Sequence, residues 1–554
     1  MEQLSSHTPA FNGISKTASS KSLAFGLLVA ASVSSILSSP KWGMALFAWM
    51  APVFYLYFFR LSNVKKKMLL ALPVMVFSSL TGMLDVVPFP LPVLLAFAIL
   101  EGIKMLVIYR TDQLIAGKTN HFLSTLFFPA ASVSFAFLSS KMGGGVWWSV
   151  ANTQFSFKWL IQLASVTGLW GISFMIYWFA SVAVWALKNR NSKRSSAKGL
   201  MIFGSAMILA LSFGAFRYHV IDSGQHRVRV AGVTFPMLGF LENLYRDYSG
   251  EQVCIDPKIA VGSAALRKVN QAQLPFVESA DTIRFRRGYA ALNQAIDSLF
   301  KLSQRAADSG ASIIIWSEAN AIVFGFDERS LVARGKNFAA KNKVYLQMAM
   351  AVIHPGKITA GSKFLENEAL LIGPEGQLLN TFHKNNPVPM AEASVPGDGL
   401  IPQASTAYGK LSTSICYDAD FPVQMRQLGR QHSDVLLLPS GDWYAISPYH
   451  SYMAIFRGIE NGNSVIRQAS GGLSLASDYR GKIHASLDYY QPGEKFWVAN
   501  VPFGHVQTLY AVIGDAFAYG CVAVAMAGWI LMGLSAMRRR RHVLSVQSPA
   551  QALA

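Results

Sequence analysis

The sequence predicts a polytopic α-helical membrane bundle of about eight transmembrane helices joined to one water-soluble, layered α/β domain. Two observations support this fold class. First, 52% of the residues are hydrophobic and only 14% are charged, which is too apolar for an ordinary soluble protein. Second, the apolar residues gather in runs long enough to cross a bilayer core, which takes about 20 residues. No comparable run interrupts the stretch between Arg217 and Leu509.

Seven apolar segments precede Arg217 and an eighth closes the chain. In order, they are Leu23–Leu37, Gly43–Phe59, Met68–Leu84, Leu91–Tyr109, Phe122–Leu138, Trp159–Leu187, Gly199–Phe216 and Tyr510–Met537. They predict a tail over 1–22, a seven-helix membrane domain over 23–216, a soluble domain over 217–509, a last transmembrane helix over 510–537 and a tail over 538–554. The polar N-terminal residues lack a small-residue cleavage site, so we expect the first segment to be retained.

The net charge of +19 marks orientation rather than a nucleic-acid partner. With the N-terminus inside, the short inner segments carry 17 Lys and Arg residues, whereas the short outer loops carry only Lys41, Lys141 and Lys158. This asymmetry follows the positive-inside rule and predicts that both tails are cytoplasmic and that the soluble domain faces outward. That domain holds 28 basic against 25 acidic residues, so no nucleic-acid footprint is expected there.

The soluble domain alternates predicted strands and helices, which indicates an α/β layered fold with few hairpins. The expected strands include 226–234, 311–318, 344–353, 410–416, 433–440 and 464–470, and the segment 367–384 is expected to form two strands joined by a Pro-Glu-Gly turn. The expected helices include 282–307 and 452–462. Glu318, Lys384 and Cys416 each stand at the C-terminal end of a predicted strand. Sites in layered α/β folds gather at that edge, so we expect the three groups to meet there.

A carboxylate, an amine and a thiol at one edge could perform acyl transfer. A thiol attacks an acyl carbon as the thiolate, so Cys416 needs a base, which Glu318 could supply. Lys384 could stabilise both the thiolate and a tetrahedral oxyanion, together with the backbone N–H of Tyr417. Glu392, eight residues after Lys384, could orient the lysine. Each residue alone also has a structural reading, as a surface charge, a loop lysine or a buried cysteine.

Three motifs resemble those of the nitrilase, or carbon–nitrogen hydrolase, superfamily: "IIIWSEANA" around Glu318, "FHKNNPVPMAE" around Lys384 and "SICYDADFP" around Cys416. Within that superfamily, the whole layout resembles the bacterial apolipoprotein N-acyltransferase family. "LIQLASVTGLWGISFMI" and "FRGIENGNSVIRQASGG" are similar to further family segments. The resemblance implies a nitrilase-like αββα sandwich, a catalytic Glu318–Lys384–Cys416 triad and supporting residues at Glu392, Tyr417 and Asp418.

The family resemblance also implies the reaction. Cys416 would take an acyl chain from a membrane phospholipid, with phosphatidylethanolamine as the expected donor, and pass it to the α-amine of a diacylglyceryl-cysteine at a lipoprotein N-terminus. The catalytic domain would then face the periplasm from the bacterial inner membrane. The chain departs from the family pattern at Ser317, at Asp418 and in "GVTFPMLGF" after the first strand.

Other residues carry weaker expectations. Trp443, Tyr444 and Tyr449 lie in "GDWYAISPYHSYM", which is either a lipid-facing loop or an aromatic core stretch. Glu101 and Lys104, one turn apart in the fourth apolar segment, are expected to pair with each other. His383 and His450 could join the site or be structural. A disulfide between Cys254 and Cys416 is compatible with an oxidising compartment, but the spacing does not favour one. Neither a phosphate loop nor a metal-ligand spacing is present, so no cofactor or metal is expected.

Two other functions share parts of this pattern. A membrane-anchored nitrilase-like amidase, or a diverged acyltransferase with another acceptor, would keep the same three groups. A catalytically inactive membrane scaffold would have no need of all three. A transporter would require internal repeats or paired broken spans, and the sequence shows neither.

Overall fold

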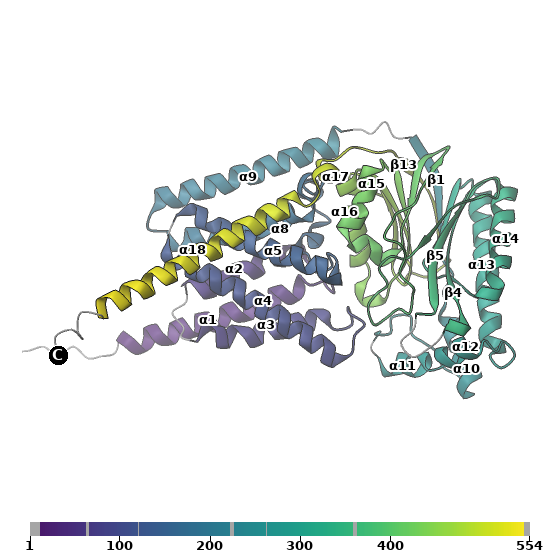
Figure 1. Cartoon of the computed structure of the whole chain (residues 1–554), viewed down its shortest axis with the longest axis horizontal. Helices are drawn as coiled ribbons and strands as arrows, with labels where there is room; N and C mark the ends of the chain where they lie inside the picture. The colour runs from purple at the N-terminus through teal and green to yellow at the C-terminus, as the bar shows by residue number, and fades with distance from the viewer. Residues whose placement is uncertain are drawn as a thin grey trace, which may run out of the picture.

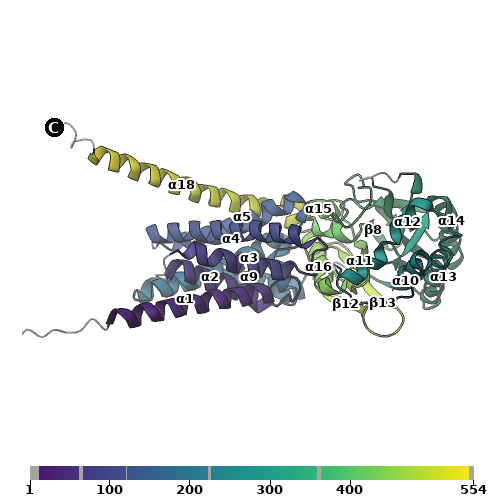
Figure 2. The same ribbon diagram turned by 90° about the horizontal axis from the view of Figure 1, so that it is seen from below.

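The chain folds into a helical bundle and a β-sandwich, which lie end to end (Figure 1). The computed structural model describes residues 12–61, 66–119, 121–221, 226–261, 263–357 and 363–547. Figure 2, seen from below, shows the same division, with the first and last helices both running into the bundle end far from the sandwich. The predicted tails lie partly outside the described residues, and so do the side chains of Arg538 to Arg541.

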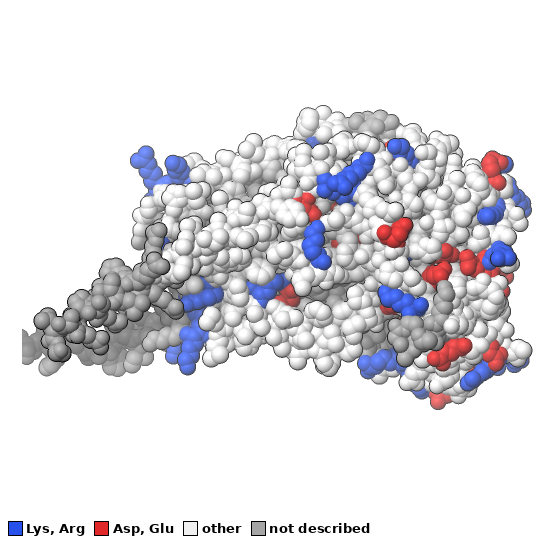
Figure 3. Space-filling view, viewed as in Figure 1, with Lys and Arg blue, Asp and Glu red and all other residues white. Residues whose placement is uncertain are grey.

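Apolar helices make up the bundle. Its longer helices are α1 (Asn12–Leu37), α2 (Ala45–Leu61), α3 (Lys67–Met83), α4 (Leu91–Lys118), α5 (Phe127–Ser139), α8 (Leu169–Lys188), α9 (Lys193–His219) and α18 (Ala516–Gln547). Within the described residues, five helical stretches are long and apolar enough to cross a membrane, and three shorter apolar helices accompany them. The N-terminal half is therefore built as a membrane-embedded bundle. Figure 3 shows most of the bundle's basic side chains on this face at the end far from the sandwich.

Two apolar segments are not the continuous helices that the sequence predicts. The sixth breaks into α6 (Lys158–Ile161), α7 (Ala164–Thr167) and α8, because Gly168 adopts a φ of +64° that ends α7. The last begins as α17 (Leu509–Ile513) and breaks at Gly514 before α18. The Tyr510 ring packs so closely on Gly168 that a Cβ there would lie 2.7 Å from it, so the two breaks support each other.

Two sheets form the sandwich. One has the strand order β13-β1-β2-β4-β5-β6, with β3 paired to β4, and the other has the order β12-β11-β10-β9-β8-β7. The strands are β1 (His226–Val233), β2 (Ile313–Trp316), β3 (Ala321–Phe324), β4 (Tyr345–Ile353), β5 (Leu365–Ile372), β6 (Leu378–His383), β7 (Gln403–Thr406), β8 (Gly409–Thr413), β9 (Val435–Gly441), β10 (Ser464–Ser470), β11 (Leu473–Ser477), β12 (Ile483–Asp488) and β13 (Phe496–Phe503). Five pairs of consecutive strands are antiparallel and therefore form hairpins: β4–β5, β5–β6, β7–β8, β10–β11 and β11–β12. The expectation of few hairpins is therefore wrong.

Helices cover both outer faces of the sandwich, giving an αββα arrangement. The outer faces carry α13 (Arg286–Asp308) with α14 (Gly325–Asn342), and α15 (Pro422–Arg430) with α16 (Tyr449–Asn461). Shorter helices α10 (Leu238–Ser249), α11 (Ala264–Asn270) and α12 (Gln273–Ser279) follow β1. Figure 1 places α15 and α16 between the sheets and the bundle, and α13 and α14 on the far side.

Strand β9 shows how the layers are held. Val435 and Leu437 are buried between the two sheets, whereas Leu436 and Leu438 pack under α15 and α16. Because successive side chains of a strand point to opposite faces, a strand covered on both faces reads as a continuous apolar run. On the bundle side, Ile455 and Phe456 of α16 share one apolar cluster with Trp170 of α8. The sandwich is therefore packed directly onto the bundle rather than tethered to it.

Candidate active site

Glu318 lies just beyond the end of β2 in a rigid turn. Its backbone N–H donates to the Ser440 carbonyl at 3.3 Å, and Ala319 after it has a φ of +49°. The Phe235 N–H donates to Asn320 Oδ1, and Asn320 Nδ2 donates to the Phe235 carbonyl, both at 2.7 Å. This turn is therefore fixed to the neighbouring β1 connection, and it directs the carboxylate into the strand-end edge of the sandwich.

Lys384 follows β6 and is fully buried. Its Nζ donates to Glu318 Oε1 at 2.7 Å and to Glu392 Oε1 at 2.5 Å. Asn367 Nδ2 donates to the same Glu318 oxygen at 2.8 Å, so it orients the carboxylate. Burial alone would lower the pKa of Lys384, but the two carboxylates outweigh it and raise that pKa well above its usual range. The lysine is therefore an ammonium held between two acids.

Cys416 opens a 3₁₀ turn, Cys416–Asp420, that comes after β8. Its φ of +46° is rarely adopted by a side-chain-bearing residue, and such strained backbone persists where surrounding structure enforces it. Its Sγ lies 3.4 Å from the Gly441 carbonyl oxygen. Burial and the Glu318 charge raise the pKa of the thiol well above its usual range, while Lys384 and Arg467 oppose that rise. At rest the group is a thiol, so its chemistry requires a base.

Asp418 joins the nucleophile turn to the lysine segment. Its carboxylate accepts the backbone N–H of Asn386 at 2.7 Å, the Asn386 side-chain amide at 2.8 Å and the Asn385 N–H at 3.3 Å. Burial raises the pKa of Asp418 to about 6, although these bonds favour the charged form. The sequence singled out Asp418 only by its place in the motif; the two asparagines carried no signal beyond their position after Lys384.

The bundle reaches the nucleophile turn through the loop that follows α5. Tyr417 donates its hydroxyl to the Gly143 carbonyl at 3.0 Å, and the Val146 N–H donates to the Asp420 carbonyl at 2.8 Å. A Cβ on Gly145 would lie 2.5 Å from that same Asp420 oxygen. The membrane half therefore shapes the turn that carries Cys416, a contact that no local sequence pattern announces.

A second charged group lies on the other side of Cys416. Asp442 accepts two hydrogen bonds from Arg467, at 2.8 and 2.9 Å, and contacts His450 Nδ1 at 2.8 Å. Cys416, Asp442 and His450 offer atoms within 4.8 Å of one another, the spacing of a small metal site. Both Asp442 oxygens are already engaged by the Arg467 guanidinium, however, and a cation there would meet that charge. We therefore assign the group to electrostatics rather than to metal binding.

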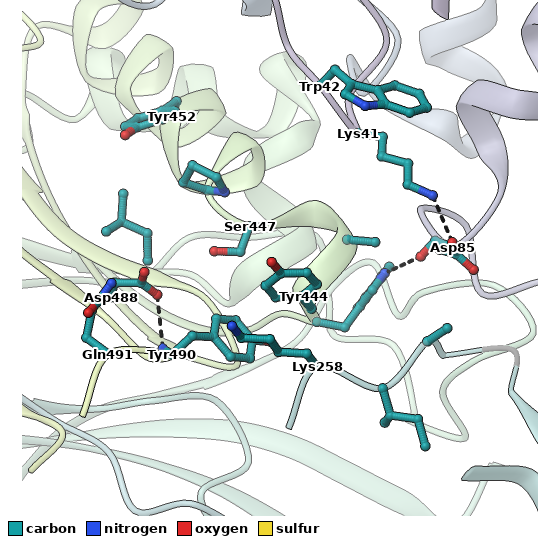
Figure 4. A pocket seen from close by; sticks show the side chains of 16 residues that line it. Lys41, Trp42, Asp85, Lys258, Tyr444, Ser447, Tyr452, Asp488, Tyr490 and Gln491 are labelled. Carbon is teal, nitrogen blue, oxygen red and sulfur yellow. Dashed lines mark hydrogen bonds and ion pairs between the residues drawn. The ribbon is translucent and has the colours of Figure 1, made fainter. Parts of the chain in front are cut away.

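The three aromatic residues expected at a lipid-facing loop have different surroundings. Tyr444 is 47% exposed, and together with Trp443 it lines a cavity of about 750 Å³ between the sandwich and the bundle loops (Figure 4). Trp443 Nε1 donates to the Asp85 carbonyl at 2.9 Å. Tyr449 is buried beside Trp147 and belongs to an apolar cluster, the alternative that the sequence left open.

The remaining candidates are also placed by the structure. Glu101 and Lys104 form the expected ion pair within α4. His383 is 44% exposed in its side chain and lies 3.5 Å from Glu368, outside the Lys384 contacts. Cys254 and Cys416 are both free, so the possible disulfide is not formed.

Family models match two separate parts of the chain. Residues 264–509 match the carbon-nitrogen hydrolase family model, and residues 31–182 match the model of the apolipoprotein N-acyltransferase N-terminal domain. The chain belongs to the apolipoprotein N-acyltransferase family. A relative of this name from Geobacter metallireducens is 24% identical over 429 residues, 72% of this chain and 71% of that protein.

Other members of the apolipoprotein N-acyltransferase family give similar matches. A second from Treponema pallidum is 23% identical over 72% of this chain and 73% of that protein. One from Shewanella oneidensis is 32% identical over a shorter stretch, 24% of this chain and 26% of the relative. Among solved structures, an amidase from Nesterenkonia sp. has a TM-score of 0.34 at 17% identity, covering 51% of this chain and 93% of that chain.

Proposed function

We propose that the protein is an apolipoprotein N-acyltransferase that works by a ping-pong reaction through an acyl-thioester on Cys416. The observation that supports it most is the Glu318–Lys384 pair beside the buried Cys416. The relatives that match across both halves of the chain carry this activity in their names. Glu318, Lys384 and Cys416 would then form the catalytic triad.

In the first half-reaction, the Cys416 thiol loses its proton to Glu318 and its Sγ attacks the ester carbonyl of a phospholipid. The C–O bond of the ester breaks, and a lysophospholipid leaves with the proton that Glu318 returns. Lys384 and the Tyr417 N–H stabilise the oxyanion of the tetrahedral intermediate. Glu392 keeps Lys384 directed at the site, since it contacts the same ammonium.

In the second half-reaction, the α-amine of a diacylglyceryl-cysteine attacks the thioester. Glu318 accepts the proton of the amine, the C–S bond breaks as the amide forms, and Glu318 returns the proton to the Cys416 sulfur. Water competes for the thioester, so the buried position of Cys416 favours the lipid acceptor. Trp443 and Tyr444, which line the cavity, are proposed to contact lipid or lipoprotein.

The proposal includes a topology. Eight transmembrane helices with a cytoplasmic N-terminus would place the nitrilase-like catalytic domain in the periplasm, in a multi-pass protein of the bacterial inner membrane. The membrane domain would cover residues 23–216, the catalytic domain 217–509 and the last span 510–537. Phosphatidylethanolamine is the proposed acyl donor.

The products of the reaction distinguish this function from its alternatives. Purified full-length protein in detergent is incubated with acyl-labelled phosphatidylethanolamine and a synthetic diacylglyceryl-cysteine peptide, with Cys416→Ala as the control. The proposed function predicts a labelled amide on the peptide that Cys416→Ala does not form. Labelled free fatty acid without amide would instead indicate a hydrolase or a different acceptor, and no labelled product would favour a scaffold.

A further inference from the structure

A buried cluster of four charged side chains packs against the nucleophile turn, and we call it the His450 cluster: Asp420, Asp442, His450 and Arg467. All four side chains are at most 5% exposed. They come from four elements: the turn that holds Cys416, the end of β9, helix α16 and strand β10. Burying a charge is costly unless an opposite charge compensates it, so the positive and negative charges of the cluster are expected to balance.

His450 lies between two carboxylates, one at each ring nitrogen. Nδ1 is 2.8 Å from Asp442 Oδ1, and Nε2 is 3.4 Å from Asp420 Oδ2. Asp420 Oδ2 has no hydrogen-bond partner within the described residues, so the His450 imidazolium is the group that compensates its negative charge. A carboxylate at both nitrogens suits the imidazolium, which carries a proton on each; Arg467 Nη2 also lies 3.1 Å from Nδ1. Burial and the Arg467 charge lower the pKa of His450, but Asp420 and Asp442 outweigh them and raise it to about 9.

With His450 protonated, the cluster holds two positive and two negative charges. Arg467 is bound to both oxygens of Asp442, and His450 contacts Asp442 and Asp420. A neutral His450 would leave one uncompensated negative charge, and the ring of His450 lies within 4.8 Å of Cys416 Sγ. An unbalanced negative charge at that distance opposes formation of a thiolate.

We propose that His450 is a positioning residue for the thiol chemistry: its imidazolium balances Asp420 and Asp442 so that the Cys416 thiolate forms beside a cluster of no net charge. The inference rests on the proposed role of Cys416 as nucleophile. The proton of the thiol still passes to Glu318, and His450 keeps both of its protons throughout.

The groups on the bundle side of the His450 cluster, and the two tyrosines beside it, add no charge to it. The Trp147 ring lies 5.1 Å from the imidazole, and the Val146 N–H holds the Asp420 carbonyl. The phenol of Tyr449 faces Asp420, and that of Tyr490 faces Asp442; burial raises the pKa of each, so both stay neutral. On the far side of Cys416 stand Glu318 and Lys384. The imidazole is also 3.1 Å from Arg467 Nη2, and among the described residues its ion pairs are those with Asp420 and Asp442.

The test measures the thiolate directly and needs no lipid. The rate of Cys416 alkylation by iodoacetamide is followed by peptide mass at pH 7, where His450 is protonated, in a Cys254→Ser background. We expect His450→Gln to slow alkylation about 100-fold, the effect on the thiolate fraction of one unit charge about 5 Å away at an effective dielectric constant of about 20. His226→Gln, at an exposed histidine on β1, is the matched control and leaves the rate unchanged.

Charge balance, rather than packing, is tested by Asp420→Asn. Alone it speeds alkylation at pH 7, a gain that damage to the fold would not produce. Combined with His450→Gln it leaves Asp442 and Arg467 as a neutral pair, so the rate at pH 7 returns to within about two-fold of the wild type. The inference is overturned if the double variant is alkylated no faster than His450→Gln, or if Asp420→Asn alone does not speed alkylation. Because no acyl substrate enters the assay, these results stand whether or not Cys416 transfers lipid acyl chains.

Discussion

Replacing Lys384 by Met tests the electrostatic core of the site. The change removes a fully buried ammonium that contacts Glu318 at 2.7 Å and Glu392 at 2.5 Å, while leaving a side chain of similar length. Breaking a buried ion pair by removing one partner costs about 3–5 kcal/mol, because the charge left behind is uncompensated. We therefore expect the melting temperature at pH 8 to fall by about 10 °C, since about 2–4 °C accompanies each kcal/mol in a domain of this size.

The loss depends on pH in a defined direction. Without Lys384, the two carboxylates repel each other, and the pKa of one of them rises in the folded protein. A group whose folded pKa is raised contributes stability below its unfolded pKa, near 4.3, and loses that contribution as pH rises through the folded value. The deficit is therefore smaller at pH 5 than at pH 8.

The assay is thermal unfolding of the full chain in detergent, followed by tryptophan fluorescence at both pH values. Lys343→Met is the matched control, because Lys343 pairs with Glu375 at the surface, where both side chains are at least 66% exposed. That exposed pair should be worth less than about 1 kcal/mol. A Lys384→Met deficit that equals the control, or that does not change with pH, would refute the reasoning.

Two further predictions follow from contacts around Cys416. Gly145→Ala puts a Cβ 2.5 Å from the Asp420 carbonyl at a φ of +53°, so Cys416 acylation should fall at least 10-fold, whereas Gly144→Ala, with its nearest atom at 4.0 Å, should leave the rate unchanged. Because the folded pKa of His450 is about 9, its stabilising charge is present below about pH 6.5 and is lost as pH rises through 9, so the melting temperature should fall further over that range in the wild type than in His450→Gln. Equal slopes in the two proteins would contradict the second prediction.

The meeting of Glu318 and Lys384 could be predicted from sequence because strand periodicity is local. Each residue follows an apolar run, and strands that run parallel within a sheet bring their C-terminal ends to one edge. Strands β2 and β6 run in the same direction, because two antiparallel pairings separate β6 from β4, which is parallel to β2. Their ends therefore meet even though 66 residues separate Glu318 from Lys384.

What the sequence could not provide comes from contacts between distant segments. The break at Gly168 depends on the Tyr510 ring, and an apolar composition gives no sign of such an interruption. The bond from Val146 to Asp420 joins the membrane half to the nucleophile turn across more than 270 residues. Arg467 was part of a strand pattern, and only the fold shows that its guanidinium reaches Asp442 behind Cys416.

The central claim, that Cys416 accepts the acyl chain, is tested most directly by the mass of the intact protein. Wild type, Cys416→Ala and Cys416→Ser are each incubated with acyl-labelled phosphatidylethanolamine in the absence of any acceptor, and the adduct is then exposed to hydroxylamine. The account predicts one acyl group on the wild type, mapped to Cys416 and released by hydroxylamine, and none on Cys416→Ala. An adduct that survives hydroxylamine, maps to Cys254 or Cys521, or persists in Cys416→Ala would contradict it.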